Sequence, residues 1–225
     1  MTSTGRTARA LRTRAGSLRT VRFLVVAALT LVVAPIAGAE NERGAALFAL
    51  CSQCHGEQGQ GKELFLAPAI AGLGDWYVTS QLQMFQSGAR GLHHGDTGGM
   101  RMVPMSRWLR SDDDLKAVAA YVASLPKVEP KQVLENGDPA KGKAAYALCA
   151  SCHGAEGKGN EQMNAPRLAG ASDWYLLSSL HKYKAGIRGS NPANGNAMMM
   201  RGMAVSLADD QAMRDVVAYI NTLAE

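Results

Sequence analysis

The stretch CSQCHGEQGQG, from Cys51 to Gly61, places two cysteines three positions apart with a histidine directly after the second. The chain writes nearly the same stretch again as CASCHGAEGKG, from Cys149 to Gly159. Cysteines at this spacing can form a redox disulfide, supply half of a zinc site or anchor a cofactor covalently. The rest of the sequence has to decide among these three kinds of site.

A shift of 98 residues superimposes the two stretches and continues far beyond them. Without a gap, residues 43–125 align with residues 141–223, with about 32 identities in 83 positions. The repeat has the length of a whole domain rather than of a short solenoid unit. We therefore predict a tandem duplication, with domain 1 at residues 40–127, a proline-rich linker at residues 128–140 and domain 2 at residues 141–225.

The N-terminal 39 residues differ from everything that follows. They carry six arginines and no acidic residue, then the apolar run FLVVAALTLVVAPI from Phe23 to Ile36, then Ala37-Gly38-Ala39. A basic segment, a short apolar core and a small-residue end are typical of a secretory signal peptide. The apolar run is 14 residues long, shorter than the roughly 20 residues that a membrane-spanning helix needs. We predict that residues 1–39 are a cleaved signal and that the mature protein is periplasmic.

Cleavage of the signal changes the charge balance of the chain. The full chain has 24 Lys and Arg against 19 Asp and Glu, and the loss of six arginines leaves 18 against 19. The basic character of the whole sequence therefore gives no reason to expect nucleic acid as a partner.

Each copy is expected to be all-helical, because no segment alternates apolar and polar residues as a strand would. Three helices are expected in each copy. The first leads into the cysteines, and the second begins at an Asp-Trp pair. The last begins with acidic residues, which suit the helix dipole. We predict a loop for the methionine-rich stretch before the last helix. The predicted ranges of the first two helices in each copy are 41–50, 76–86, 139–148 and 174–184.

The cysteine pairs are best explained as haem attachment sites. No strands flank them, as a thioredoxin-like pair requires, and each copy lacks the four ligands of a zinc site. Cys-x-x-Cys-His is the attachment signature of c-type haem. Cys51 and Cys54, like Cys149 and Cys152, would bind the vinyl groups of one haem in each copy. A haem would also supply an apolar core to domains that are poor in large apolar residues.

The histidine of each signature is expected to bind the haem iron. His55 and His153 would then be the proximal ligands, and a partner on the other ring nitrogen should orient them. The carbonyls of Pro68 and Pro166, in matching AP-x-x-AG segments, are the candidates for this partner.

The ligand on the other face of the iron decides between a carrier and a catalyst. Three methionines recur at the repeat offset in glycine-rich segments, and the candidates are Met100, Met102, Met105, Met198, Met199, Met200 and Met203. His93 and His94 are an alternative in the first copy. Arg90 and Arg188 are interpreted as contacts to haem propionates, as residues between the domains, or as solvated side chains, and Lys182 and Lys184 as a solvated helix face.

The order of CxxCH, AP-x-x-AG, a DWY helix, GxRG, M-x-x-M and a last helix ending in A-Y-x-x-x-L resembles class I cytochrome c. The duplicated form is similar to the dihaem cytochromes of the c4 type, over essentially the whole mature chain. The resemblance implies an all-α fold of two tandem domains, each a small helical fold around a covalent haem c. It also selects Met102 and Met200 as iron ligands, with Met105 and Met203 as alternatives.

These patterns predict an electron-transfer protein rather than an enzyme. The expected partners are redox proteins: a quinol-oxidising complex or dehydrogenase as donor and a terminal oxidase or reductase as acceptor, with peripheral association at membrane respiratory complexes. No small-molecule substrate is expected. The alternatives are a cytochrome subunit of a larger dehydrogenase, such as a flavocytochrome sulfide dehydrogenase, and a dihaem enzyme, such as a peroxidase or a thiosulfate-oxidising cytochrome.

Overall fold

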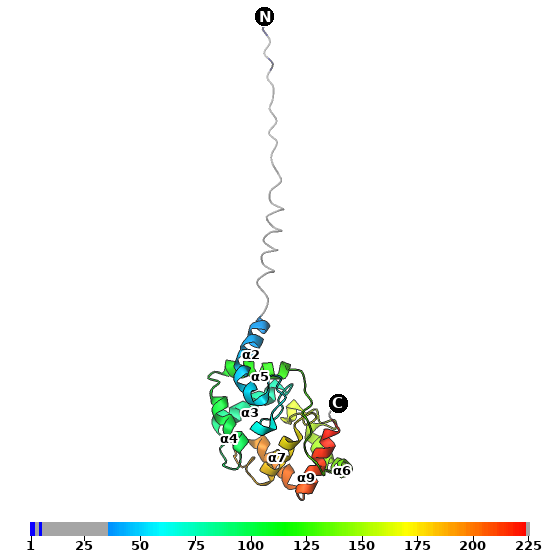
Figure 1. Cartoon of the computed structure of the whole chain (residues 1–225). Helices are drawn as coiled ribbons and strands as arrows, with labels where there is room; N and C mark the ends of the chain where they lie inside the picture. The colour runs from blue at the N-terminus through cyan, green and yellow to red at the C-terminus, as the bar shows by residue number, and fades with distance from the viewer. Residues whose placement is uncertain (3–4, 6–35, 224–225) are drawn as a thin grey trace. The chain divides into compact units, whose positions relative to one another are not determined.

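The computed structural model describes residues 1–2, 5 and 36–223, so most of the predicted signal peptide lies outside the described residues. The first copy consists of α2 (Ile36–His55), η1 (Glu63–Phe65), α3 (Asp75–Ser87), α4 (Thr97–Arg107) and α5 (Asp112–Ser124). The second copy repeats this order as α6 (Pro139–His153), η2 (Glu161–Met163), α7 (Asp173–Lys184), α8 (Gly195–Val205) and α9 (Asp210–Asn221) (Figure 1). Among the described residues the only β-pairings are two isolated bridges, one in each copy. The all-α prediction is confirmed.

Most of the predicted helices form where the sequence placed them, and one kind of element was predicted wrongly. The cysteine helices continue past their predicted ends, through both cysteines to His55 and His153. The methionine-rich stretches, predicted as loops, are the helices α4 and α8. Each of these begins at a side chain that caps it: Asp96 accepts a hydrogen bond from the Gly99 amide, and Asn194 accepts one from the Ala197 amide. Such caps satisfy amide groups that a helix start otherwise leaves unpaired.

The first and last helices of each copy cross at a glycine. Gly44 of α2 lies against the Ala117 carbonyl of α5, and Gly142 of α6 lies against the Asp215 carbonyl of α9. A side chain at either glycine would overlap the backbone of the partner helix. The two glycines are 98 residues apart and therefore belong to the repeat. A residue without a side chain lets the two backbones approach closely, and this fixes where the CxxCH helix sits.

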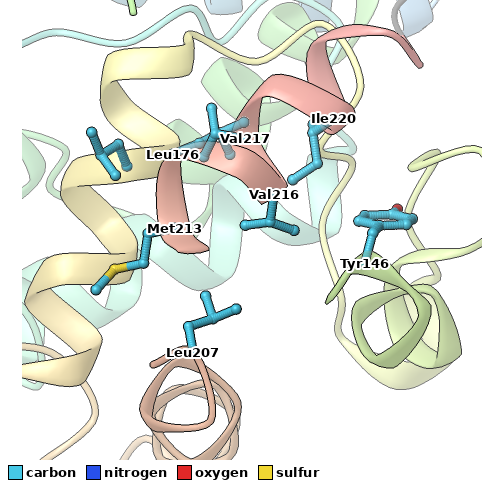
Figure 2. Packing of buried hydrophobic residues seen from close by; sticks show 8 residues of the cluster. Tyr146, Leu176, Leu207, Met213, Val216, Val217 and Ile220 are labelled. Carbon is cyan, nitrogen blue, oxygen red and sulfur yellow. The ribbon is translucent and has the colours of Figure 1, made fainter. Parts of the chain in front are cut away.

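The hydrophobic core of the second copy gathers on α9. Val216, Val217 and Ile220 of this helix lie between Leu176 of α7 and Tyr146 of α6 (Figure 2). The core of the first copy is smaller, and its fully buried members are Phe48, Leu109, Val118 and Val122. Several members of the α9 cluster, among them Val216 and Ile220, line a space that also reaches the CxxCH helix and the methionine helix. That space is part of the cavity described below.

The linker between the copies is held by two buried carboxylates. Asp173 Oδ2 accepts hydrogen bonds from the amides of Val133 and Leu134, at 2.7 and 2.8 Å. Asp215 Oδ1 accepts one from the Asp138 amide, at 2.8 Å. Backbone donors bound to an ionised carboxylate make strong hydrogen bonds. The linker is therefore fixed on the second copy rather than strung loosely between the two.

A turn after each short 3₁₀ helix differs between the copies. Leu66 ends η1 with φ 56°, and Asn164 ends η2 with φ 50°. Asparagine tolerates this left-handed conformation, whereas leucine adopts it at a cost in free energy. The first copy therefore carries a leucine at a position whose backbone favours asparagine.

Two substitutions test this assignment of backbone strain. Leu66→Val should lower the free energy of unfolding by about 1–2 kcal/mol, because a β-branched residue fits the left-handed region worst. Leu66→Asn should stay within about 1 kcal/mol of the parent, because relief of strain offsets the lost apolar contact. Denaturant unfolding followed by circular dichroism measures both. Equal losses for Val and Asn would contradict the assignment.

Candidate functional site

The two signature histidines end α2 and α6 and are buried, with 7% and 5% of their surface exposed. His55 Nδ1 lies 2.8 Å from the Pro68 carbonyl oxygen, and His153 Nδ1 lies 2.7 Å from the Pro166 carbonyl oxygen. The predicted partners are therefore confirmed. A carbonyl can only accept, so Nδ1 donates its proton and Nε2 keeps a free lone pair. Burial lowers the pKa of both histidines, although the carbonyl contact opposes this, and the neutral, metal-binding form is favoured.

The four cysteines form no disulfide with one another, and each pair lies on the last turn of its helix. Burial raises the pKa of Cys51 and Cys149, which disfavours the thiolate form. A redox-active pair needs a lowered cysteine pKa, so this environment does not suit thiol–disulfide exchange. Across residues 36–223 no group of three or more His, Cys, Asp or Glu side chains is arranged to hold a metal ion.

One cavity of about 550 Å³ joins the two copies. Its lining is mostly apolar, and it includes both signature histidines, both prolines that accept their hydrogen bonds, and methionines from both methionine helices: His55, Pro68, Met102, His153, Pro166, Met199, Met200 and Met203. Apolar walls with a few convergent polar groups are typical of cofactor sites. Because each copy has few large apolar residues, a cofactor was expected to complete its core, and this cavity is the space that such a cofactor would occupy.

The methionines divide according to whether they reach this cavity. In the first copy Met102 is partly buried and lines it, whereas Met105 is 37% exposed and does not. In the second copy Met199, Met200 and Met203 all line it, but Met199 is 56% exposed, whereas Met200 and Met203 are partly buried. The geometry of the first copy therefore favours Met102, and the repeat carries this preference to Met200 at the same offset.

The histidine alternative in the first copy finds no support in the geometry. His93 and His94 are exposed, and their rings stack on each other at 4.4 Å between centroids. Neither lines the cavity, although Gly95 and Asp96, directly after them, do.

Arginines join the two copies beside the cavity. Arg90 Nη2 donates to Tyr175 Oη of the second copy at 2.9 Å, and Arg167 Nη2 donates to the Ala71 carbonyl of the first at 3.1 Å. Burial alone would raise the pKa of Tyr175, but the Arg90 and Arg188 guanidinium groups lower it. Arg188 is only 7% exposed, so its interpretation as a solvated side chain was wrong. Arg90 fits the interpretation as a residue between the domains.

Two of these arginines keep a buried donor without a partner. Arg90 Nε and Arg167 Nε make no hydrogen bond within the described part of the chain, and both residues line the cavity. A buried cationic donor is costly unless an acceptor or anion meets it. The carboxylates of haem propionates are groups of this kind. The apolar cavity, its neutral histidines and its unpaired arginine donors therefore fit the chemistry of haem.

A buried ion pair crosses between the copies at the same place. Lys182 Nζ of α7 lies 2.7 Å from Asp96 Oδ1, and the aspartate side chain is 3% exposed. Burial opposes ionisation of Asp96, but the hydrogen bond and charge of Lys182, with further help from Arg90 and the Gly99 amide, hold its pKa below the ordinary value. The interpretation of Lys182 as a solvated residue was wrong. Lys184 also departs from it, because it donates to the Leu207 and Ala208 carbonyls.

Sequence reasoning did not identify this ion pair. Its members occupy positions 98 residues away from Asn194 and Met84, so neither charge is repeated in the other copy. A difference between otherwise matched copies was the available signal. A search for residues that the two copies share does not find residues that occur in only one of them.

The membrane question has one structural finding. Among the described helices, none combines the length and hydropathy that crossing a bilayer requires.

Comparison with known proteins places the chain in a family. The cytochrome c family model matches residues 41–126 and again residues 139–224. Cytochrome c4 of Stutzerimonas stutzeri is 31% identical over 205 residues, which cover 84% of this chain and 92% of that protein. The crystal structure of reduced cytochrome c4 from Pseudomonas stutzeri superposes with a TM-score of 0.60 at 29% identity, covering 80% of this chain and 96% of the other.

A thiosulfate dehydrogenase from Marichromatium purpuratum, in its as-isolated form, superposes with a TM-score of 0.66 at 28% identity. The match covers 81% of this chain but only 40% of the dehydrogenase chain, so the likeness concerns part of that longer protein.

The fold and the two matched sites thus define a protein of two tandem cytochrome c domains. The chain belongs to the cytochrome c family, as a dihaem member of the cytochrome c4 type. It carries two covalently bound haems, one in each domain.

Proposed function

We propose that the chain is a periplasmic electron carrier that exchanges single electrons with partner proteins through two haems. One observation carries the proposal. Both copies present the same buried histidine bonded to a proline carbonyl, and a matched methionine, to one shared cavity. Two equivalent sites of this kind suit two similar redox centres rather than one redox centre and one substrate site.

The residue roles follow from the two sites. Cys51, Cys54, Cys149 and Cys152 would attach the haems, and His55, His153, Met102 and Met200 would supply the ligands to the irons. The haem supplies a one-electron couple between ferrous and ferric iron. The protein fixes the positions of the ligands. Each histidine donates its Nδ1 proton in a hydrogen bond to a proline carbonyl, and this bond sets the tautomer and orients the ring.

A methionine on the second side explains why we propose a carrier and not an enzyme. With histidine and methionine both bound, no position remains open for a substrate, and the thioether raises the reduction potential. The mostly apolar lining of the cavity keeps water away, which reduces the charge rearrangement that accompanies each electron.

We further propose the domain plan predicted from the sequence: a cleaved signal at residues 1–39, domains at residues 40–127 and 141–225, and a linker at residues 128–140. Export fits covalent haem, which is attached outside the bacterial cytoplasm. The partners are a donor, such as a quinol-oxidising complex or a dehydrogenase, and an acceptor, such as a terminal oxidase or reductase. The likeness to part of a thiosulfate dehydrogenase favours a dehydrogenase as donor.

A spectroelectrochemical titration of the purified protein tests the proposal. The account expects uptake of two electrons per chain in two one-electron steps, and no turnover when thiosulfate or peroxide is added to the isolated protein. Sustained turnover of either compound would contradict it, because it requires an iron with an exchangeable position. Isolation only in a stable complex with a dehydrogenase would favour the subunit alternative.

A further inference from the structure

The two copies differ in character at the surface around η1. In the first copy this segment reads Leu64-Phe65-Leu66, and these side chains are 88%, 42% and 42% exposed. The equivalent residues of the second copy are Gln162, Met163 and Asn164. Leu64, the most exposed of the three, gains little for the fold, since burial is what makes apolar residues stabilising.

The backbone conformation of Leu66 is a second unusual feature of this turn. It occupies the left-handed region at φ 56°, where the second copy uses asparagine at φ 50°. The first copy thus accepts both strain and exposure to present an apolar side chain here. Strained or unfavourable residues that the fold does not require point to a functional use.

Two cations frame this surface. Lys62 Nζ lies 5.8 Å from the centre of the Phe65 ring, and Arg101 Nη1 of α4 donates to the Phe65 carbonyl at 2.9 Å. Both cations are exposed. The second copy has Asn160 and Met199 in their places, so it lacks both charges, and only the middle position of its turn, Met163, is apolar.

The framed surface also adjoins the haem cavity. Leu66 lines that cavity, and so does Gly98 of α4, which packs against Leu66. A partner seated on the triplet would therefore lie next to the site of the first haem. Electron transfer needs this kind of proximity, and the equivalent turn of the second copy, which exposes Met163, carries neither of the two framing cations.

We infer that Leu64, Phe65 and Leu66, framed by Lys62 and Arg101, form a docking surface for a redox partner protein whose contact face is apolar and bordered by carboxylates. The first domain is then the one through which electrons are exchanged with this partner. Opposite charges at the rim steer the encounter, and apolar contact at the centre holds it. The inference rests on the proposed function, since it assumes that the chain exchanges electrons with other proteins.

The second copy supplies the residues for the test. The variant Leu64→Gln/Phe65→Met/Leu66→Asn gives the first copy the apolar surface of the second, and Lys62→Asn/Arg101→Met gives it the charges of the second. The matched control, Glu161→Ala/Gln162→Ala, changes exposed residues of the same turn in the second copy that do not line the cavity. All three variants change only exposed positions. Haem content and circular dichroism check that each variant is folded.

The measurement is the stopped-flow oxidation of the reduced holoprotein by respiratory membranes from the organism that makes it, at ionic strengths from about 0.01 to about 0.3 M. The triplet variant should lose tenfold or more in second-order rate constant at every ionic strength. The charge variant should lose severalfold at low ionic strength only, and its salt dependence should be flatter. The control should match the parent.

Each other outcome overturns the inference in a recognisable way. Parent-like rates for the triplet variant, or an equal loss in the control, would remove the docking surface while leaving the carrier function intact. If the membranes fail to oxidise the parent protein, the proposed function fails, and the inference with it. If the parent forms a dimer that the triplet variant does not, or binds phosphatidylglycerol vesicles that the variant does not, the surface serves a second copy or a lipid surface instead.

Discussion

Replacement of Met200 by alanine is expected to abolish the far-red methionine–iron absorption band of one haem and to lower the reduction potential of that haem by at least about 0.1 V, within the roughly 0.8 V range that axial ligands span. Met102→Ala should do the same to the other haem. The reason is that thioether ligation raises the potential, and its loss leaves an open or water-bound position. Visible spectroscopy with redox titration measures both effects.

Met105→Ala and Met203→Ala are the matched controls, since each removes a methionine of the same M-x-x-M segment. Both should keep the band at parental amplitude. Met105 is 37% exposed and lies off the cavity, so its variant is the cleaner control. A Met200→Ala spectrum identical to that of the parent, with the band lost in Met203→Ala, would transfer the ligand role in the second domain to Met203.

Removal of Lys182 is expected to cost about 3 kcal/mol of unfolding free energy, because it leaves the Asp96 carboxylate buried without its cation. Lys182→Met is the natural choice, since Met84 occupies the equivalent position of the first copy. The double variant Asp96→Asn/Lys182→Met should recover most of the loss. It removes the buried charge, and asparagine still caps the methionine helix as Asn194 does in the second copy. Denaturant unfolding of the holoproteins measures these differences.

Losses that simply add in the double variant would contradict this account of the pair. They would mean that each residue acts by itself and not through the other. A loss below about 0.5 kcal/mol for Lys182→Met would show that the pair behaves like an exposed one.

The same pair predicts how stability responds to acid. The folded protein holds the pKa of Asp96 below its ordinary value, so the ionised form stabilises the fold. This contribution is complete above the unfolded carboxyl pKa of about 4 and is lost as the pH falls below it. Asp96→Asn should therefore flatten that part of the stability curve. An unchanged acid limb in the variant, measured by unfolding between about pH 5 and pH 2.5, would assign the effect to other carboxylates.

The repeated features of the molecule could be predicted from the sequence because the chain states them twice. The CxxCH stretches, the proline partners of the histidines and the paired methionines recur at an offset of 98, and the histidine–proline contacts are confirmed at 2.8 and 2.7 Å. The chemistry of these residue types allows few functional roles for each of them. A histidine that binds a metal needs an acceptor on its other nitrogen, and a proline carbonyl nearby is a simple one to provide.

Other features escaped for physical reasons. The helices α4 and α8 were taken for loops because they contain Gly98, Gly99 or Gly202 and polar residues, which lower helix propensity. The caps at Asp96 and Asn194 and the packing of Val103 and Ala204 outweigh that preference. The Asp96–Lys182 pair joins residues 86 positions apart across the interface between domains, and no local pattern marks such a contact.

The most direct test of the central claim is the absorption and electron paramagnetic resonance spectrum of the purified holoprotein in its oxidised state. We expect two haems per chain, both low-spin, with the methionine–iron band at an amplitude for two haems. One high-spin haem, or half the band, would contradict this expectation, since an iron without its methionine has an open face and belongs to a catalyst rather than to a carrier.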